Sequence, residues 1–259
     1  QNAKVAIRDE GVFFDFAKFI ESVNFLHQCL SVLSAAYYPT KLTFQSFEMR
    51  YSELSSSDVI EATQDWEENL FLPFYQKTIV PVIIRKKPKL VGISIAGSTQ
   101  IIPALTLARL IKSEDNQIHI TIGGNIFTRL ADVLQLQQKK IFFEKFFDSI
   151  IVHEGELPLL NLIENLDSGK GLHSVPNLVY YDGKQVVANK IAPLIPIDKL
   201  PPPDFDDFPV ERYFCTKLIL PILTTRGCYW GRCAFCDHGH IYSGGCECRN
   251  LARLIDEFR

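Results

Sequence analysis

The stretch LVGISI at residues 90–95 decides the fold of this chain. Its β-branched and aliphatic side chains favour a short buried strand. A turn containing Gly97 follows, and apolar residues then recur at helical spacing from Pro103 to Lys112. The stretch and the residues behind it therefore predict one strand–loop–helix unit.

The same format returns twice further along the chain. HITI at residues 119–122 leads into a Gly-Gly-Asn turn at 123–125. SIIV at 149–152 leads into a His-Glu-Gly-Glu turn at 153–156, and a helix from Glu156 to Leu166 is predicted behind that turn. Three such units in succession predict an α/β fold with a doubly wound parallel sheet.

The turns after these strands predict a ligand site. In open α/β sheets, ligands bind beyond the carboxyl ends of the strands, where such turns converge. Glycine lets the backbone approach a ligand closely, although it also simply permits tight turns. A bulky residue at Gly124 is accordingly expected to block the ligand and to leave the fold intact. The candidate cofactor-binding residues in these turns are Ser94, Gly97, Ser98, Gly123, Gly124, Asn125, Glu154, Gly155 and Glu156.

Changes in composition divide the chain into four predicted parts. These are an N-terminal helical segment (1–54), the α/β domain (55–192), a proline-rich linker (193–216) and the start of a second domain (217–259). Within them, the sequence predicts a long packed helix over 12–37, a hairpin turning at Asp182-Gly183 and a strand over 217–223.

The composition is that of a globular protein. The 259 residues are 47% hydrophobic and 22% charged, with a net charge of −3. No basic block is longer than Arg85–Lys87, so we expect no binding to nucleic acid. No apolar run approaches the roughly 20 residues of a spanning helix, so we expect no membrane insertion and a cytoplasmic location. Because an initiating Met and a leader are absent, the chain is interpreted as a fragment.

Cysteines are concentrated near the end of the sequence. Five of the seven lie between Cys228 and Cys248, and this odd, crowded set favours metal ligation over a disulfide framework. The segment 226–236 reads RGCYWGRCAFC and places Cys228, Cys233 and Cys236 in a C-x4-C-x2-C array after a predicted strand. Three thiolates at this spacing can converge on one metal centre.

Four interpretations of this array are open. A disulfide is one, and a thioredoxin-like dithiol at Cys233 and Cys236 is another. A [4Fe–4S] cluster held by three cysteines, with one iron open to a further ligand, is the third. The fourth is a structural zinc site, whose fourth ligand could come from Cys246, Cys248, His238 or His240.

The array and its surroundings resemble the first loop of radical S-adenosylmethionine enzymes, in the order strand, Arg-Gly-Cys, aromatic–glycine bend and Cys-Ala-Phe-Cys. The resemblance implies that Cys228, Cys233 and Cys236 ligate a [4Fe–4S] cluster, that S-adenosylmethionine chelates the fourth iron, and that Phe235 lies near the adenine. It also implies reductive cleavage to a 5′-deoxyadenosyl radical that removes hydrogen from an unactivated carbon. The usual spacing in the family is C-x3-C-x2-C. The extra residue is typical of members that carry a cobalamin-type domain and modify ribosomally made peptides.

Residues 55–210 resemble, more loosely, the cobalamin-binding domains that precede many radical S-adenosylmethionine barrels. The matches are the strand at 91–95, the Gly-Gly-Asn turn and the Glu154-Gly155-Glu156 turn. The Asp-x-His-x-x-Gly signature, whose histidine ligates cobalt in other cobalamin proteins, is absent, and His153 is only a remote substitute. The resemblance implies either cobalamin bound without that histidine or a domain that has kept the fold and lost the cofactor.

Together the resemblances imply the front part of an enzyme, ending early in a (β/α) barrel. They imply radical modification, including cobalamin-dependent methylation, of a peptide or natural-product substrate, with an electron donor such as flavodoxin or ferredoxin. Cys246 and Cys248 are expected to be bystanders. With only the first barrel unit present, the chain alone is expected to be inactive. The alternative is a zinc-stabilised, non-catalytic ligand-binding or interaction module.

Overall fold

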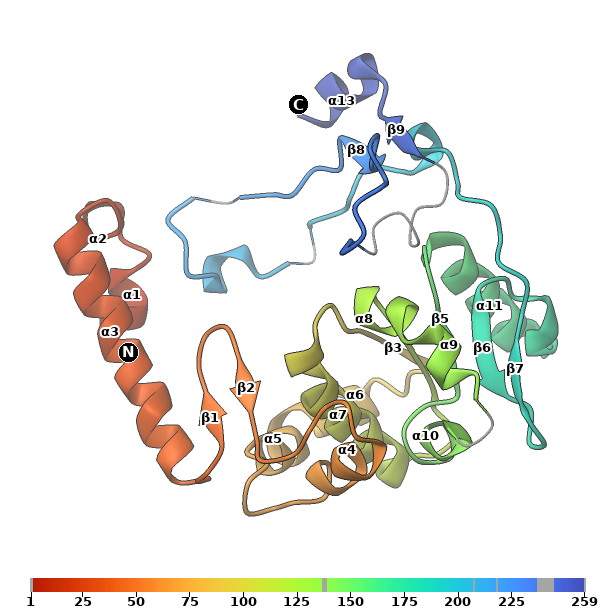
Figure 1. Ribbon diagram of the computed structural model, residues 1–259. Helices are drawn as coiled ribbons and strands as arrows, with labels where there is room; N and C mark the ends of the chain where they lie inside the picture. Colours follow the sequence, from red (N-terminus) through yellow and green to blue (C-terminus); the bar gives the residue numbers. More distant parts are fainter. Residues whose placement is uncertain (1, 137–138, 207, 218, 237–244, 259) are drawn as a thin grey trace.

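The computed structural model describes residues 2–136, 139–206, 208–217, 219–236 and 245–258. Its centre is a mixed α/β unit built on a five-stranded sheet (Figure 1). In spatial order, the strands are β3 (Leu90–Ser94), β4 (His119–Gly123), β5 (Ser149–Ile151), β6 (Leu178–Tyr181) and β7 (Val186–Ala188). The three strands predicted from the repeated strand–loop–helix pattern, and the predicted hairpin, are confirmed.

The sheet is parallel only over its first three strands. β3 pairs with β4 and β4 with β5 in parallel, whereas β5 with β6 and β6 with β7 are antiparallel. The described strands also follow chain order, without the reversal that defines a doubly wound sheet. The predicted parallel, doubly wound sheet is therefore correct only for the parallel core. The short turn at Asp182-Gly183 joins β6 to β7 as a hairpin, and such a turn cannot carry a parallel crossover.

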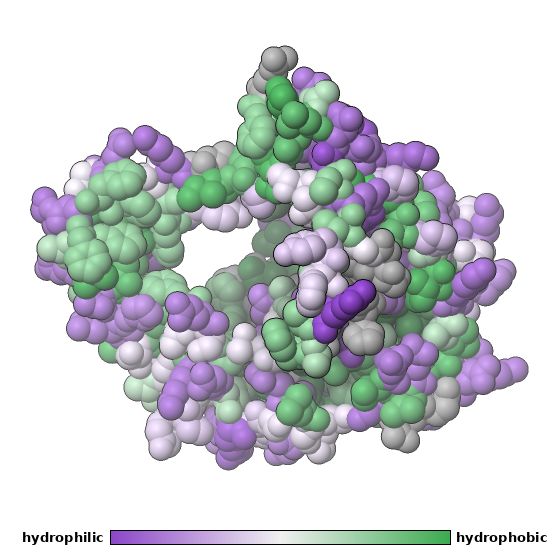
Figure 2. Space-filling view, turned by 45° about the horizontal axis from the view of Figure 1, so that its top comes forward, coloured by the Kyte–Doolittle hydropathy of each residue, from purple (hydrophilic) through white to green (hydrophobic). Residues whose placement is uncertain are grey.

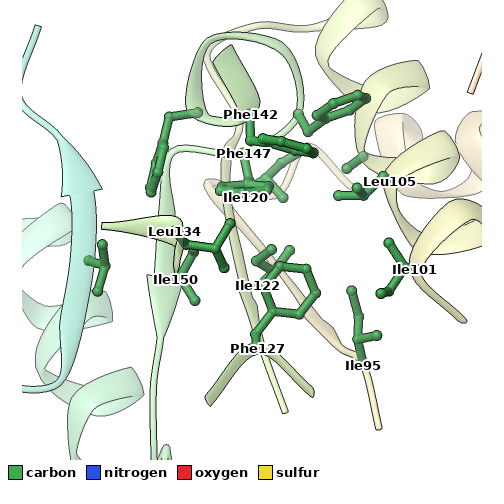
Figure 3. Packing of buried hydrophobic residues seen from close by; sticks show 14 of the residues in the cluster. Ile95, Ile101, Leu105, Ile120, Ile122, Phe127, Leu134, Phe142, Phe147 and Ile150 are labelled. Atoms are coloured by element: carbon green, nitrogen blue, oxygen red, sulfur yellow. The ribbon is translucent and has the colours of Figure 1, made fainter. Parts of the chain in front are cut away.

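One face of the sheet is covered by the crossover helices. α7 (Ile101–Glu114) joins β3 to β4, while α8 (Asn125–Arg129), α9 (Ala131–Leu134) and α10 (Lys140–Lys145) join β4 to β5. Right-handed crossovers that advance in one direction place their helices on the same face. Side chains of the strands, the helices and the segment before β5 form one buried cluster there, including Ile120, Ile122, Ile150, Leu105, Phe142 and Phe147 (Figure 3). This cluster is the main hydrophobic core.

The opposite face is covered over β5 and β6. There α11 (Glu156–Ser168) packs Leu162 in one cluster with Ile151 and Leu178. Side chains alternate along a strand, so Gly92 and Ser94 of β3 share a face, and both are exposed. Among the described elements, the sheet therefore keeps an uncovered patch over β3 and β4.

The chain begins with three helices, α1 (Asn2–Ala6), α2 (Glu10–Phe13) and α3 (Phe16–Ala35). The predicted long helix is confirmed over α3, but its expected packing is wrong, because Leu26 and Ser34 are the only buried residues of α3. Apolar side chains gather on the surface of this segment (Figure 2). Phe14, Phe16 and Phe25 are exposed. Arg8 donates hydrogen bonds to the carbonyls of Tyr213 at 3.0 Å and Arg212 at 2.6 Å.

A second group of helices links this segment to the sheet. After the hairpin β1 (Lys41–Leu42) and β2 (Phe47–Glu48) come α4 (Ser56–Ala62), α5 (Phe71–Phe74), a π-helical turn (Tyr75–Ile79) and α6 (Val80–Arg85). These helices contact α7. Buried Asn69 joins the group to α7, since its Nδ2 donates to the Ala62 carbonyl and to Thr106 Oγ1, both at 2.9 Å.

The last part of the chain is a small hairpin and a helix. β8 (Thr225–Gly227) pairs antiparallel with β9 (Cys246–Cys248), and α13 (Leu251–Glu257) follows. The strand predicted over 217–223 is wrong: residues 219–223 lie outside any strand, and no described strand pairs with them.

Short 3-10 turns lie at Ser98–Gln100, Leu172–Ser174, Ile197–Lys199 and Val210–Arg212. Within the described chain, no helix combines the length and apolar character needed to cross a membrane. The four-part domain division stays a prediction.

Candidate functional site

A cavity of about 470 Å³ lies on the uncovered sheet face. Its floor includes Gly92 and Ser94 from β3 and Thr121 and Gly123 from β4. A Cβ at Gly92 would meet no more than Thr121 Cγ2, at 3.9 Å, so space remains above this glycine. The first turn of α11 borders the cavity through Glu156 and Leu159. Small residues on two parallel strands thus leave a concave surface beside a helix N-terminus.

The cavity includes part of the set predicted from the turns. Ser94, Gly123, Gly124, Gly155 and Glu156 line it. The predicted residues Gly97, Ser98, Asn125 and Glu154 are not among its lining residues. Sequence reasoning missed Gly92, Thr121 and Ile151, which lie inside strands and not in turns. The small residues at alternating positions 92 and 94 were the available signal.

Gly124 contributes to packing as well as to the cavity wall. Its φ is +98°, a conformation that L-residues rarely adopt, and a Cβ there would overlap the backbone of Ile95. The Ile95 N–H also donates to the Gly123 carbonyl at 2.9 Å, which holds the two chain segments together. The expectation that a bulky residue at Gly124 leaves the fold intact is therefore wrong.

His153 lies at the border between this cavity and a second one. Its φ of +60° is left-handed, and its backbone N–H donates to Thr128 Oγ1 at 2.9 Å. Backbone strain of this kind often accompanies functional sites. The second cavity, a cleft of about 460 Å³, lies between the turn at 153–156 and the chain leading into the cysteine loop. Leu200, Leu223 and Thr225 form its other side.

Glu154 borders this cleft and carries an ion pair to the cysteine hairpin. Its Oε2 accepts from Arg226 Nη1 at 2.6 Å. Burial raises the pKa of Glu154, and the Arg226 guanidinium opposes that shift. The Asn177 side chain donates to the Glu154 backbone carbonyl at 3.2 Å. The turn after β5 is thus held from two sides.

The three predicted cluster cysteines lie on the loop that leaves β8, and all three are free thiols. The Gly231 N–H approaches Cys228 Sγ at 3.4 Å, and the Cys236 N–H donates to the Cys233 carbonyl at 3.1 Å. In the described part of the chain, no three Cys, His, Asp or Glu side chains are close enough together to hold a metal ion. His238 and His240 lie outside the described residues.

The position between Arg226 and Cys228 requires a glycine for conformational and steric reasons. Gly227 has a φ of +86°, and a Cβ there would collide with the carbonyl oxygen of Gly245 on the neighbouring segment. Phe235, predicted to lie near an adenine, has 91% of its surface exposed. Its binding role stays a prediction, as does cluster ligation.

Cys246 and Cys248 lie on β9, across the hairpin from this loop. Cys246 pairs with Gly227 and Cys248 with Thr225. As alternate residues of one strand, they share a face. Cys246 therefore lies beside the residue that precedes Cys228. The predicted bystander role is untested.

Two buried arginines, which sequence reasoning did not single out, hold the linker. Arg226 donates to the Ile195 carbonyl, and Arg249 donates to the Ile197 carbonyl at 3.3 Å. Arg249 also pairs with Glu257 of α13. The start of the predicted linker is consequently part of the packed cysteine hairpin. Arg226 stands in the Arg-Gly-Cys motif, which was the only signal in the sequence.

Comparison with known proteins finds no matching family model. An uncharacterized methyltransferase from Pyrococcus horikoshii is 25% identical over 181 residues, which cover 69% of this chain and 38% of that protein. A 4′-phospho-dehydrooxetanocin synthase from Priestia megaterium is 28% identical over 166 residues, which cover 62% of this chain and 21% of that protein. The chain spans well under half the length of either curated relative.

Two solved structures of the radical S-adenosylmethionine methyltransferase TsrM from Kitasatospora setae are also similar. The structure with cobalamin and a [4Fe–4S] cluster has a TM-score of 0.48 and 16% identity, and covers 71% of this chain and 38% of that one. The structure with tryptophan substrate and an S-adenosylmethionine analogue has a TM-score of 0.47 and 16% identity, and covers 71% of this chain and 37% of that one.

Proposed function

We propose that this chain is the cofactor-binding front part of a radical S-adenosylmethionine methyltransferase. In this proposal, the cavity over β3 and β4 holds cobalamin, and Cys228, Cys233 and Cys236 hold a [4Fe–4S] cluster that binds S-adenosylmethionine. The observation that carries the proposal is the ion pair between Glu154, beside the cavity, and Arg226, two residues before the first cysteine. Similarity to the methyltransferase from Pyrococcus horikoshii supports the reaction class.

The cavity residues fit a large cofactor rich in polar groups. The glycines at 92 and 155 leave space for close approach to the backbone. Ser94 contributes a hydroxyl group that can donate and accept hydrogen bonds. α11 begins at the cavity rim, and the first N–H groups of a helix lack intrahelical partners. These groups would bind cobalamin without a histidine from the missing signature, and His153 would border the cofactor without ligating cobalt.

The cysteine loop fits an iron–sulfur cluster in its donor chemistry. Three thiols within nine residues match the thiolate ligands that such clusters take. Gly231, at a φ of +59°, provides a bend between the first and second cysteine. When bound, the cluster supplies an electron to S-adenosylmethionine and the corrinoid carries a methyl group. The chain's own contribution is to hold both sites next to the cleft at 153–156, where a substrate would lie between them.

The proposed substrate is a peptide or natural product, and the proposed electron donor is a flavodoxin or ferredoxin. Both proposals rest on the C-x4-C-x2-C spacing and its resemblance to enzymes that modify ribosomally made peptides. Activity belongs to the whole protein, because the curated relatives are much longer than the matched region. The chain alone is therefore proposed to bind cofactors without turning over substrate.

Metal and cofactor analysis after reconstitution without oxygen tests the proposal. We expect about four irons per chain, a brown colour lost in air, and hydroxocobalamin that stays with the protein through gel filtration. One zinc and no iron would favour the zinc-stabilised module instead. Iron without cobalamin would show that the α/β unit has kept its fold and lost that cofactor.

A further inference from the structure

The side chain of Arg226 is buried between two carboxylates from different parts of the chain. Only 4% of its surface is exposed. Nη1 donates to Glu154 Oε2 at 2.6 Å, and Nη2 donates to Glu247 Oε2 at 2.7 Å and to the Ile195 carbonyl. Removing one partner from a buried ion pair leaves a charge without compensation, so these contacts strongly restrict the position of β8.

On the hairpin side, further contacts connect Arg226 directly to the cysteine loop. Arg226 and Glu247 are directly opposite each other in the β8–β9 ladder. Gly227 then packs against the Gly245 carbonyl, and the Cys228 N–H donates to that same oxygen at 3.2 Å. Little freedom therefore remains between the guanidinium and the first cysteine.

On the sheet side, the contact ends in the turn that forms the cavity wall. Glu154 lies between His153 and Gly155, and both of these residues line the cavity. His153 is held in its left-handed conformation by Thr128. A ligand that contacts this turn therefore lies one residue away from the carboxylate that pairs with Arg226.

We propose that Arg226 is a positioning residue that sets the cysteine loop relative to the cavity through Glu154, so that a ligand in the cavity changes the reactivity of Cys228. This inference deepens the proposed function and rests on it for the identity of the ligand. The two carboxylates differ in role. Glu154 connects the guanidinium to the cavity wall, whereas Glu247 lies within the hairpin itself.

The test compares Glu154→Gln with the matched control Glu247→Gln, because each removes one ion pair from the same guanidinium. The rate of Cys228 alkylation by iodoacetamide is followed by peptide mass spectrometry, with exposed Cys29 of α3 as the internal reference. In the unsubstituted chain and in Glu247→Gln, we expect hydroxocobalamin to change the rate of Cys228 alkylation by about fivefold. In Glu154→Gln, we expect hydroxocobalamin still to bind, with an affinity that differs from that of the unsubstituted chain by no more than about fivefold, and to leave the rate of Cys228 alkylation unchanged.

The outcomes separate this inference from the proposed cofactor. An equal response to hydroxocobalamin in both variants, or its loss in both, overturns the positioning role. If the unsubstituted chain binds no hydroxocobalamin, the proposed cofactor is wrong. The positioning role is then tested by the rates of Cys228 alkylation without ligand. Glu154→Gln must then raise the Cys228 rate by about fivefold over Glu247→Gln, and equal rates overturn the inference. Arg226→Lys, which cannot form both contacts through a planar fork, is expected to behave like Glu154→Gln.

Discussion

The α-carbon of Gly124 lies against the backbone of Ile95, so the turn after β4 packs on the end of β3. Replacing Gly124 by Ala combines a strained positive φ with a steric overlap. We expect the free energy of unfolding to fall by roughly 2–4 kcal/mol. Urea denaturation measures the change. Gly97→Ala is the matched control, since Gly97 has a φ of −140° and a Cβ there would meet no neighbouring atom within 4 Å. Equal losses in the two variants would contradict this account.

Gly92 provides a separate test of the cavity. Gly92→Val adds a side chain that projects into the cavity from β3, where a β-branched residue suits the strand. We expect hydroxocobalamin affinity to fall by about tenfold or more, equal to about 1.4 kcal/mol. The free energy of unfolding should change by less than about 1 kcal/mol. Gly97→Val discriminates the cavity from the turn-based prediction. Because Gly97 does not line the cavity, this variant should bind hydroxocobalamin as the unsubstituted chain does. Loss of hydroxocobalamin binding in Gly97→Val alone would favour the turns as the site.

His119 makes stability depend on pH. Its Nε2 lies 2.8 Å from Ser149 Oγ, and burial lowers its pKa, an effect that Lys112 assists and Asp148 opposes. The unfolded chain, with a histidine pKa near 6.5, therefore binds the proton more readily than the folded chain. The stability that His119 contributes is fully present above the pKa of the unfolded chain. It is lost as the pH falls below that value and through the lowered pKa of the folded chain.

Urea unfolding at about pH 7.5 and about pH 5.5 measures the effect of His119. His119→Gln keeps a polar side chain and removes the titration, so its loss of stability on acidification should be smaller than that of the unsubstituted chain. A larger loss in His119→Gln would contradict the predicted sign.

The cysteines of β9 test which thiols hold the cluster. Cys233→Ala should prevent stable iron incorporation, because two thiolates from the loop cannot hold a [4Fe–4S] cluster. Cys246→Ala and Cys248→Ala should retain about four irons per chain, as should Cys29→Ala in α3. Iron and sulfide content after anaerobic reconstitution is the measurement. Iron loss in Cys246→Ala would show that the hairpin thiol beside Gly227 is a ligand.

The parts of this structure that could be predicted from sequence are those encoded locally. The strand at 90–95, the following helix and the hairpin at Asp182-Gly183 each depend on neighbouring residues, through periodicity and turn chemistry. The antiparallel addition of that hairpin to β5 depends instead on contacts between distant segments, and no local pattern predicts it.

The candidate site shows the same division. Ser94 and Gly123 were found because they end strands. Gly92 and Thr121 were missed because they line the cavity only once β3 and β4 pair and α11 packs over Ile151 and Leu178. The ion pair of Glu154 with Arg226 joins residues 72 positions apart, and its burial arises only when the hairpin lies against the turn. Spacing of the cysteines predicts a common metal centre, but the described loop does not bring the three thiols together.

The contacts of Arg249 have a consequence for how this protein tolerates change. The Arg249 backbone N–H donates to the Thr224 carbonyl at 2.9 Å, and its guanidinium donates to the Ile197 carbonyl. Residues on both sides of the 201–223 stretch are therefore bound to Arg249. Because closing a longer loop costs only slightly more entropy, insertions between these two points should leave the hairpin in place. This stretch is therefore where an additional recognition module could be acquired in evolution, or a reporter domain inserted by design, without changing the spacing between cavity and cysteines.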